Sequence, residues 1–471
     1  MAPPWVLLHR MVNFVDGRAT ATGGRSNDRE GFTSREGQTA AAIEWIDNSN
    51  PGEAMVAAME PDPAIVNPPE VTRMQLRVTS THPILERVLR GEVRSGRISS
   101  THQGLIVFYG SGYRWCRCYL VYDAASNSLS SIPPLPESIP NPLLGAPPYT
   151  IDGLGHTTAI LRHGEDDDGG YLVADLVTTS RAELPAAELF LWRSSSSSAT
   201  NPAGQWTPRP VRLPLPAELC GPTSFFTVDM AFSFGDSLIC WADLLAGLLV
   251  CDLATPQEPR FRFVPLPEGS VVHNPDGRRG HPQESRSIGR VGSAITFVEM
   301  IGFTQGRPAH EVAIKTWTLS SPDSKEWHEG STLLVGDLWA TESFMQMLLP
   351  RVRPMCPVLS VCEEGVVCVC LNDFERVNQI DRFGNVVGSY PKVTAHYVLL
   401  VDLKQNKVLL STKTTEPSNL LHPYVAPHLL ASDFSSHLHI TKLPTAPTTV
   451  TKRREEAEEA STVAVVKRVK Y

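Results

Sequence analysis

The chain has 471 residues, of which 42% are hydrophobic and 20% are charged, and its formal net charge is -8 at pH 7. This composition is typical of a globular protein, and the negative balance excludes a global attraction to nucleic acid or to an anionic membrane surface. The 39 prolines and 33 glycines favour many short elements joined by turns, and hence an all-β fold.

The first 15 residues contain a short apolar run, WVLL at residues 5–8, which predicts a strand that joins the main fold. This run is shorter than the roughly 7 to 15 residues of a signal-peptide core, and no later run reaches the roughly 20 residues that cross a bilayer. The nine cysteines are odd in number, and several lie in apolar strand patterns, as is typical of a reducing compartment. We therefore expect a cytoplasmic or nuclear protein that does not bind membranes.

Residues 16–39 are polar and rich in glycine, so we expect a flexible loop there. The main domain is expected over residues 40–445. Its first strand patterns lie at residues 40–46 and 71–78, and a short helical pattern follows at residues 82–93.

Residues 446–471 change abruptly to alternating blocks of charge, which predicts a charged C-terminal tail. The basic groups at residues 452–454 and 467–470 leave nuclear import or nucleic-acid contact as an alternative reading. The glutamates between them argue against an anion-binding surface, so we do not expect nucleic acid as a partner.

A repeated plan of strands is clearest in the middle of the chain. Residues 238–243 and 247–253 are apolar on both faces, and a third strand that ends in proline, FRFVPLP, follows at residues 261–267. The pair Ala246 and Gly247 is expected to make the tight reversal between the first two strands. Similar units recur at residues 104–136, 157–216, 291–334 and 358–411.

Units of roughly 50 residues with several strands each predict a β-propeller of about six four-stranded, kelch-like blades, in which the N-terminal strands complete the last blade. Stacking around a centre covers both faces of each blade, and an outer edge strand tolerates the recurring Leu-Pro pairs. The repeats are uneven in length, so a two-domain protein that resembles a β-sandwich is the alternative.

Two segments carry residue types found in functional sites. Residues 163–170, HGEDDDGG, gather carboxylates that suit a hard cation, but we interpret them as a hairpin turn. The basic residues 273–290 are interpreted as a solvated loop, with a docking surface as the alternative. Trp241 and Asp243 also invite a functional reading, but a tryptophan in such a strand is usually part of the core.

The densest group of cysteines, Cys356, Cys362, Cys368 and Cys370, lacks the paired spacing of a zinc knuckle and is interpreted as core. Gly110, Ser111 and Gly112 read as a turn. The chain has no Gly-x-Ser-x-Gly, no phosphate-binding glycine-lysine loop and no His-Glu-x-x-His. We therefore assign no catalytic, cofactor-binding or metal-binding residue, and we expect no cofactor.

Several phrases of this chain resemble the plant domain of unknown function 1618 family, which is expanded in grasses. They are WVLLHR at residues 5–10, CWADLLAGLLVCDL at 240–253, FRFVPLP at 261–267, SRSIGRVGSAITFVEMIGF at 285–303 and TWTL at 316–319. The resemblance covers roughly residues 5–410. It implies propeller-like modules such as those that follow F-box motifs, but no activity and no catalytic residues. No F-box helix triplet precedes the strands, so membership in a ubiquitin-ligase complex is not implied.

The expected function is a non-catalytic protein-interaction module that binds a protein partner through loops on one face of the propeller. The alternative is an enzyme or small-ligand binder with its site at the central channel. Converging polar side chains in that channel would favour this alternative. A second alternative is a nuclear, transcription-associated protein that uses its basic tail.

Overall fold

The computed structural model describes residues 2–18, 51–90, 96–109, 119–135, 157–162, 170–177, 184–194, 204–221, 225–255, 258–272, 279–380, 386–414 and 429–438. The predictions for residues 19–46, 110–112, 163–169 and 446–471 lie outside these stretches. The described residues belong to one unit, which extends from Met1 to Leu438.

The prediction of an all-β fold is confirmed. Four antiparallel sheets have four strands each, and neighbouring strands in each sheet are consecutive in the chain. These strands are β8 Thr158–Arg162, β9 Tyr171–Val177, β10 Ala186–Arg193, β11 Thr207–Arg212, β12 Met230–Phe234, β13 Leu238–Asp243, β14 Gly247–Asp252, β15 Arg260–Pro265, β16 Arg286–Val291, β17 Ala294–Ile301, β18 Ala313–Leu319, β19 His328–Leu334, β20 Met355–Leu359, β21 Val366–Ile380, β22 Val386–Asp402 and β23 Lys407–Thr414.

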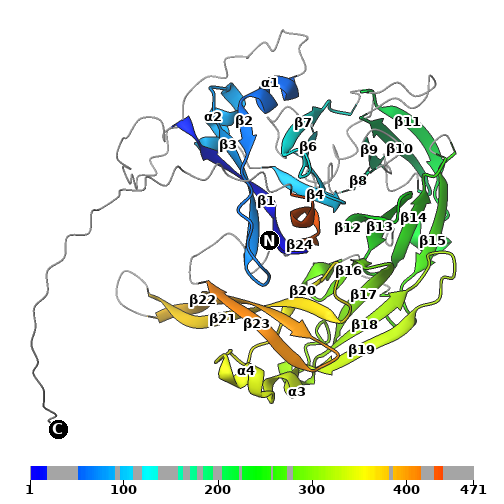
Figure 1. Ribbon diagram of the computed structural model, residues 1–471. Helices are drawn as coiled ribbons and strands as arrows, with labels where there is room; N and C mark the ends of the chain where they lie inside the picture. The colour runs from blue at the N-terminus through cyan, green and yellow to red at the C-terminus, as the bar shows by residue number, and fades with distance from the viewer. Residues whose placement is uncertain are drawn as a thin grey trace, which may run out of the picture. The chain divides into compact units, whose positions relative to one another are not determined.

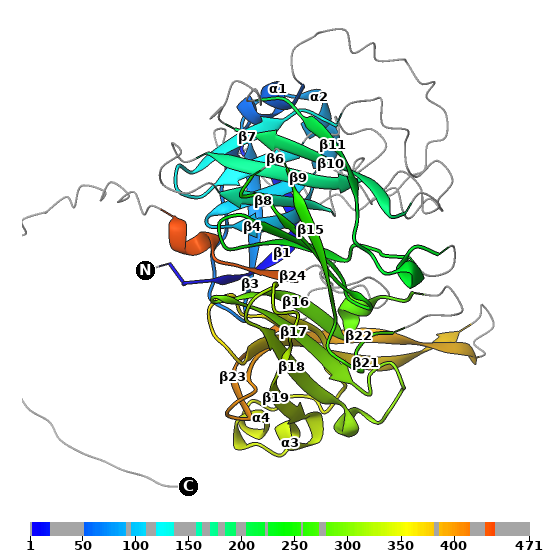
Figure 2. The ribbon, with the colours of Figure 1, turned by 90° about the vertical axis from the view of Figure 1, so that its right-hand side faces the viewer.

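A fifth sheet has eight strands and joins the two ends of the unit. Its members are β1 Val6–Asp16, β2 Met59–Pro61, β3 Val71–Val78, β4 Arg97–His102, β5 Leu105–Tyr109, β6 Tyr119–Asp123, β7 Ser128–Ile132 and β24 Leu429–Ser432. Strand β24 pairs antiparallel with β1, from Val6 opposite Ser432 to His9 opposite Leu429, and the two strands lie side by side in Figures 1 and 2. Residues near the two ends of the unit therefore share one sheet.

The sheets follow one another around a common centre, with the first strand of each sheet innermost (Figure 1). Strand β4 contacts β8 and β12, and the series of contacts continues from β12 to β16, from β16 to β20 and from β20 to β24. The edges of these inner strands face each other across the centre, so their side chains and backbone groups line the central space.

Neighbouring sheets cover both faces of each other, as β13 shows. Ile239 and Trp241 pack with residues of β8, β9 and β10, while Cys240 and Ala242 pack with residues of β16, β17 and β18. All four side chains are buried. The expectation that this strand is apolar on both faces and covered on both is confirmed.

The outer strands tolerate proline as predicted. Pro208 and Pro210 lie in β11, which is the edge strand of its sheet and pairs only with β10 among the described residues. Proline has no N–H to donate, so it fits where the ladder has no further partner.

Helices are short: α1 Pro51–Ala57, α2 Pro83–Leu89, α3 Val335–Trp339 and α4 Glu342–Gln346, besides single turns of 3-10 helix at Ala217–Leu219, Pro282–Glu284, Ala309–Glu311 and Phe434–His437. Helix α2 confirms the helical pattern at residues 82–93, and its Ile84, Leu85 and Val88 pack against β1 and β3. Within the described residues, no helix has the length and hydrophobicity needed to cross a membrane.

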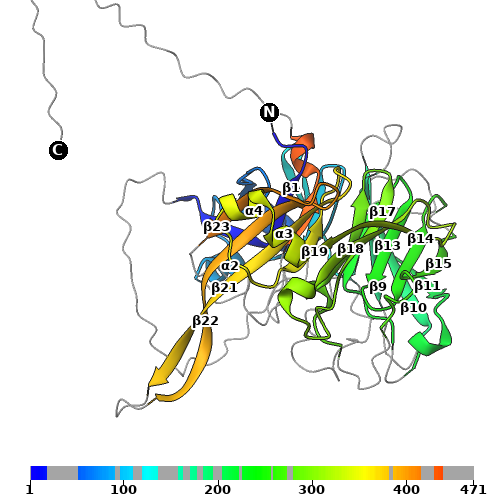
Figure 3. The same ribbon diagram turned by 90° about the horizontal axis from the view of Figure 1, so that it is seen from below.

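Strands β21 and β22 are longer than the rest and pair from Val366 opposite Asp402 as far as Ile380 opposite Val386. Their neighbours are shorter: β20 ends its pairing opposite Cys370, and β23 ends opposite His396. The outer part of the two strands, residues 374–380 and 386–394, therefore forms a ribbon without a third strand among the described residues. Figure 3 shows this ribbon extending beyond the sheets.

Two local predictions are wrong. The turn between β13 and β14 uses residues 244–246, and the Ala246 N–H donates to the Asp243 carbonyl (3.1 Å). Gly247 instead begins β14, where an added Cβ would collide with the Val264 carbonyl of the adjacent strand β15. The fourth repeat also begins earlier than residue 291, because β16 occupies residues 286–291.

Candidate binding cavity

The innermost strands enclose a cavity of about 110 Å³. Strands β4, β12, β16, β20 and β24 form its wall, together with Arg10 from β1. Much of the wall carries small residues, such as Ser99, Ala231, Ser233 and Gly289, which leave the central space unfilled. An apolar cavity of about 150 Å³ in another protein holds benzene. The present cavity therefore has room for a small molecule or for one group of a larger molecule.

Some polar side chains of the wall serve the fold, because they bind the inner edge of β8. Ser100 Oγ accepts a hydrogen bond from the Ile160 N–H (3.0 Å), and Ser233 Oγ donates to the Ile160 carbonyl (2.6 Å). His102 Nδ1 accepts from the Arg162 N–H (3.1 Å). Buried backbone groups at a strand edge need such partners.

His102 is buried in the wall, and the whole residue is only 3% exposed. Because Nδ1 accepts a backbone N–H, the proton of the neutral ring lies on Nε2. A poorly aligned hydrogen bond with the Gly235 backbone engages the ring, so Nε2 is not an unused donor. Burial, with a smaller contribution from the positive charge of Arg290, lowers the pKa of His102 to about 4, so the ring is neutral at physiological pH.

Arg10 brings a buried positive charge to the wall. It is 9% exposed, and its Nη1 donates to the carbonyls of Ile98 (3.2 Å) and Ser99 (3.0 Å), where a bulge interrupts the pairing of β4 with β5. No ion pair among the described residues includes Arg10. Burial, and then the like charge of Arg97, lower the pKa of Arg10 to about 9.

Other charged side chains of the wall form ion pairs with acids of the described residues. Arg290 binds Asp433 (Nη2 to Oδ2, 2.7 Å). Arg286 pairs with Glu299 and also donates from Nη1 to the carbonyls of Leu244 and Ser270, both at 2.8 Å. The wall contains four arginines and two aspartates in all, Arg10, Arg97, Arg286, Arg290, Asp229 and Asp433.

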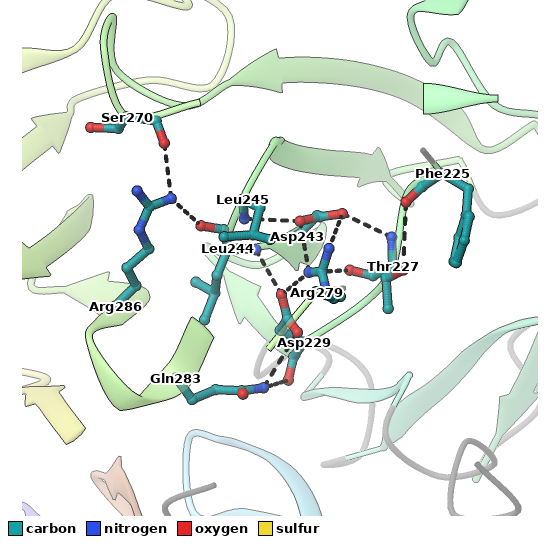
Figure 4. A network of polar contacts seen from close by, with 10 residues as sticks. All are labelled: Phe225, Thr227, Asp229, Asp243, Leu244, Leu245, Ser270, Arg279, Gln283 and Arg286. Carbon is teal, nitrogen blue, oxygen red and sulfur yellow. Dashed lines mark hydrogen bonds and ion pairs between the residues drawn. The ribbon is translucent and has the colours of Figure 1, made fainter. Parts of the chain in front are cut away.

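Beside the cavity lies a buried network in which one arginine holds two carboxylates (Figure 4). Arg279 Nη2 pairs with Asp243 Oδ1 (2.7 Å) and with Asp229. Asp243 also accepts the N–H groups of Thr227 and Leu245, both at 2.9 Å. These ion pairs and hydrogen bonds connect three segments: the start of β12, the turn after β13 and the segment that precedes β16.

Asp229 links this network to the cavity, because it lines the cavity wall. It accepts the N–H of Leu244 (2.8 Å) and the side-chain amide of Gln283 (3.4 Å). Burial raises the pKa of Asp229; the Arg279 charge opposes that shift, and the Asp243 carboxylate adds to it. Both carboxylates therefore depend on Arg279 for charge compensation.

The interpretation of residues 273–290 as a solvated loop is wrong for Arg279 and for residues 285–290, whereas Gly280 and His281 are exposed as predicted. Arg279 lies in the buried network, and Arg286 begins an inner strand where it is 6% exposed. Residues 273–278 lie outside the described stretches. The charges that suggested solvent exposure are instead compensated by buried acids and carbonyls.

Trp241 is a core residue, as predicted. Its side chain is fully buried, it stacks on Phe261 with ring centroids 6.2 Å apart, and Nε1 donates to the Thr157 carbonyl (2.6 Å). The core prediction is also confirmed for Cys356, Cys368 and Cys370, which are buried free thiols. It is wrong for Cys362, which is exposed. Within the described residues, no three His, Cys, Asp or Glu side chains are grouped as a metal site requires.

Sequence reasoning missed Arg10, His102 and Asp229, and it placed Arg279 in a solvated loop. One signal was visible, since Arg10 interrupts the apolar run WVLLHRMV at residues 5–12. A charge inside a buried strand needs a partner or a cavity. The other three residues lie in polar surroundings that resemble ordinary turns.

A model of the family described as "Protein of unknown function (DUF1618)" matches residues 241–368. No curated protein matches the chain. Among solved structures, the chain is similar to dihydro-heme d1 dehydrogenase NirN in complex with DHE, with 9% identity over 74% of this chain and 61% of that chain, and a TM-score of 0.29. It is similar to an ACO/RPE65 chimera with 8% identity over 71% of this chain and 74% of that one, and a TM-score of 0.29. For TolB from Acinetobacter baumannii the identity is 11%, the coverage 66% and 67%, and the TM-score 0.21. At these TM-scores the likenesses carry no argument about function.

Proposed function

We propose from the geometry that this chain is a non-catalytic binding module with its site at the central cavity. Residues 241–368 match the model of the DUF1618 family, whose description assigns no function. One observation carries the proposal: the cavity wall contains the buried guanidinium of Arg10, whose hydrogen bonds to the described residues run from Nη1 to two backbone carbonyls and include no carboxylate. A buried charge without an ion pair is rare in folded proteins, and it commonly marks a site for water, an ion or a ligand.

We further propose that the sheets are six blades of a β-propeller. The eight-stranded sheet divides into β24-β1-β3-β2 and β4 to β7, which are joined through the single pair Met11 and Arg97. Each half has four strands, like the other sheets. The pairing of β24 with β1 would then close the ring with strands from both ends of the unit. The parallel pairing of β1 with β3 departs from a regular kelch-like blade.

A binding role fits the wall better than catalysis does. Asp229 is the carboxylate of the wall with the raised pKa, but its oxygens are occupied by Arg279, Gln283 and a backbone N–H. Asp433, the other wall carboxylate, is paired with Arg290. Each therefore meets groups that hold it in place rather than a reacting substrate.

Filling the cavity is the direct test of this function. Gly289 lies in the wall, and a Cβ built there would meet no atom within 4 Å, so Gly289→Leu places a side chain in the cavity without backbone strain. We expect a nuclear magnetic resonance screen of small fragments, both neutral and anionic, to give hits on the wild type that disappear in Gly289→Leu. Identical hits on both proteins, with both equally folded in a thermal melt, would contradict a binding site at the cavity.

A second candidate function, the binding of a protein partner, is favoured by the ribbon of β21 and β22. An isolated pair of strands is only marginally stable in water, and its open edges can accept a further strand from another chain. The ribbon lies at residues 374–380 and 386–394. The expected cytoplasmic or nuclear location and the nuclear role of the tail stay predictions.

To test the second candidate, residues 374–394 would be replaced by an Asn-Gly turn, which suits a two-residue hairpin. We expect partners recovered with the tagged full chain from its native tissue to be lost with the shortened variant. Recovery of the same partners by both proteins would show that the ribbon does not bind them.

A further inference from the structure

A second cavity lies between the sheet β16–β19 and the sheet β20–β23, which are neighbours around the centre (Figure 1). Its volume is about 160 Å³. Of its wall residues, only Leu359 also borders the central cavity, so the two cavities are different sites. A ligand in this inter-sheet cavity does not require one at the centre.

The wall formed by β17 and β18 changes from apolar to hydroxyl-bearing side chains. Val298 and Ile314 belong to the core that packs against the sheet β20–β23. Along the same face, the next side chains are Thr296 on β17 and Thr316 and Thr318 on β18, and all three line the cavity. Valine has nearly the shape of threonine without the hydroxyl, so valines at these positions would continue the core. The threonines instead make the space between the sheets polar.

Two of these hydroxyls are available to a ligand. Thr296 is 7% exposed and Thr318 is half-buried, and the two residues lie opposite each other in the ladder. Neither hydroxyl bonds to the other or to any further residue that the structure describes. Thr316 differs, because its Oγ1 accepts the Ser331 N–H (2.9 Å) where a bulge interrupts the pairing of β18 with β19. A buried hydroxyl such as that of Thr296 needs a partner, which the cavity has room to supply.

The charges beside the cavity disfavour an ionic ligand. Lys404 Nζ pairs with Glu364 Oε2 (2.8 Å), and both side chains are exposed. Glu363 accepts the indole N–H of Trp5 (3.3 Å) and forms no ion pair with a described residue. Two carboxylates repel an anion, while the Lys404 ammonium opposes an organic cation. Within the described residues, no group of three metal-ligating side chains is present.

The size of the cavity suits a small molecule that carries several hydroxyls. A volume of about 160 Å³ corresponds to roughly five water molecules at liquid density. A ligand that displaces ordered water gains affinity only if its own groups reproduce the hydrogen bonds of that water. Hydroxyl groups both donate and accept, as water does. Val291, Leu359 and Val366 supply apolar contacts on other parts of the wall.

From these observations we propose that the inter-sheet cavity binds a small neutral polyol, up to about the size of one sugar ring. The hydroxyls of Thr296 and Thr318 form hydrogen bonds with it inside the cavity, and the Glu363 carboxylate accepts from a ligand hydroxyl at the exposed side. A site that recognises hydroxyls in this way discriminates strongly against analogues that lack them.

Xylose and myo-inositol are suitable probes, with cyclohexanol and tetramethylammonium as analogues that lack the polyol groups. Sugars and similar osmolytes stabilise many proteins in a general way, so binding is measured directly by titration in nuclear magnetic resonance. We expect at least one of the two polyols to bind the wild type more tightly than either analogue. The double variant Thr296→Val, Thr318→Val keeps the shape of the wall and should weaken that binding by about tenfold to a hundredfold, because two hydrogen bonds are lost.

Thr332→Val is the matched control, because Thr332 is an exposed residue of β19 outside the cavity wall. It should bind the polyol like the wild type, and so should Gly289→Leu, which fills the central cavity instead. Thr318→Leu fills the inter-sheet cavity and provides a second test if the double variant fails to fold in a thermal melt. The proposal is overturned if neither polyol binds, if an analogue binds as tightly, or if Thr318→Leu and the double variant bind like Thr332→Val.

Discussion

Replacing Trp241 by alanine is expected to lower the free energy of unfolding by about 3–5 kcal/mol, the usual range for removing a large aromatic side chain from a core. Trp241 is fully buried between two sheets, and its indole N–H donates to the Thr157 carbonyl. The variant loses the buried apolar area, leaves a cavity between the sheets and removes that hydrogen bond. Equilibrium denaturation in urea measures the loss.

The matched control is Trp327→Ala. Trp327 also donates its indole N–H to a carbonyl, that of Pro265 (2.8 Å), but its side chain is only half-buried. The two variants thus remove the same kind of hydrogen bond from different depths, and Trp241→Ala should be clearly the less stable of the two. Equal losses would show that Trp241 does not have the core role derived from its position between the sheets.

Replacing Arg279 by methionine has a comparably large expected effect, about 3–5 kcal/mol, because it leaves Asp229 and Asp243 as buried carboxylates without a cation. The side chains of these aspartates are 7% and 1% exposed. Adding Asp243→Asn to Arg279→Met removes one of the two stranded charges, so the double variant should recover part of the stability. Such a recovery, measured as a double-mutant cycle, distinguishes charge compensation from simple loss of packing.

The loss in Arg279→Met should depend on pH. Without Arg279, the folded-state pKa of Asp229, which burial already raises, lies further above the unfolded value of about 3.9. The folded protein then binds more protons than the unfolded chain between those values, so its stability rises as the pH falls. The deficit relative to wild type should therefore shrink between pH 7 and pH 5. Arg77→Met breaks a surface ion pair and should lower the free energy of unfolding by less than about 1 kcal/mol. A loss that small in Arg279→Met would show that the network does not compensate the buried charges of Asp229 and Asp243.

The strands that face apolar neighbours were predictable from the sequence. In β13 and β14, side chains on both faces are hydrophobic, and each face meets another sheet. Strand β16 was missed because its side chains Arg286 and Arg290 face a polar centre, where the usual apolar pattern does not apply. Strand β24 was missed because it has four residues and is defined by its pairing with β1, more than 400 positions away.

The cavity could not be predicted, because its wall combines residues that are distant in the chain. Arg10, Ser99, Gly289 and Asp433 come together only when the inner strands are arranged around one centre. The buried pairing of Arg279 with Asp243 likewise depends on the path of the segment before β16, and its residues read as a charged loop in isolation. Local sequence patterns indicate which residues are buried. Ion pairs between sheets cannot be predicted from them, because these pairs depend on how the sheets are arranged around the centre.

An experimental structure of the full chain, determined with and without a fragment that binds the wild type, tests the central claim most directly. We predict that the bound fragment lies inside the cavity that Gly289 lines. A cavity that holds only water while the fragment lies elsewhere on the protein would contradict it.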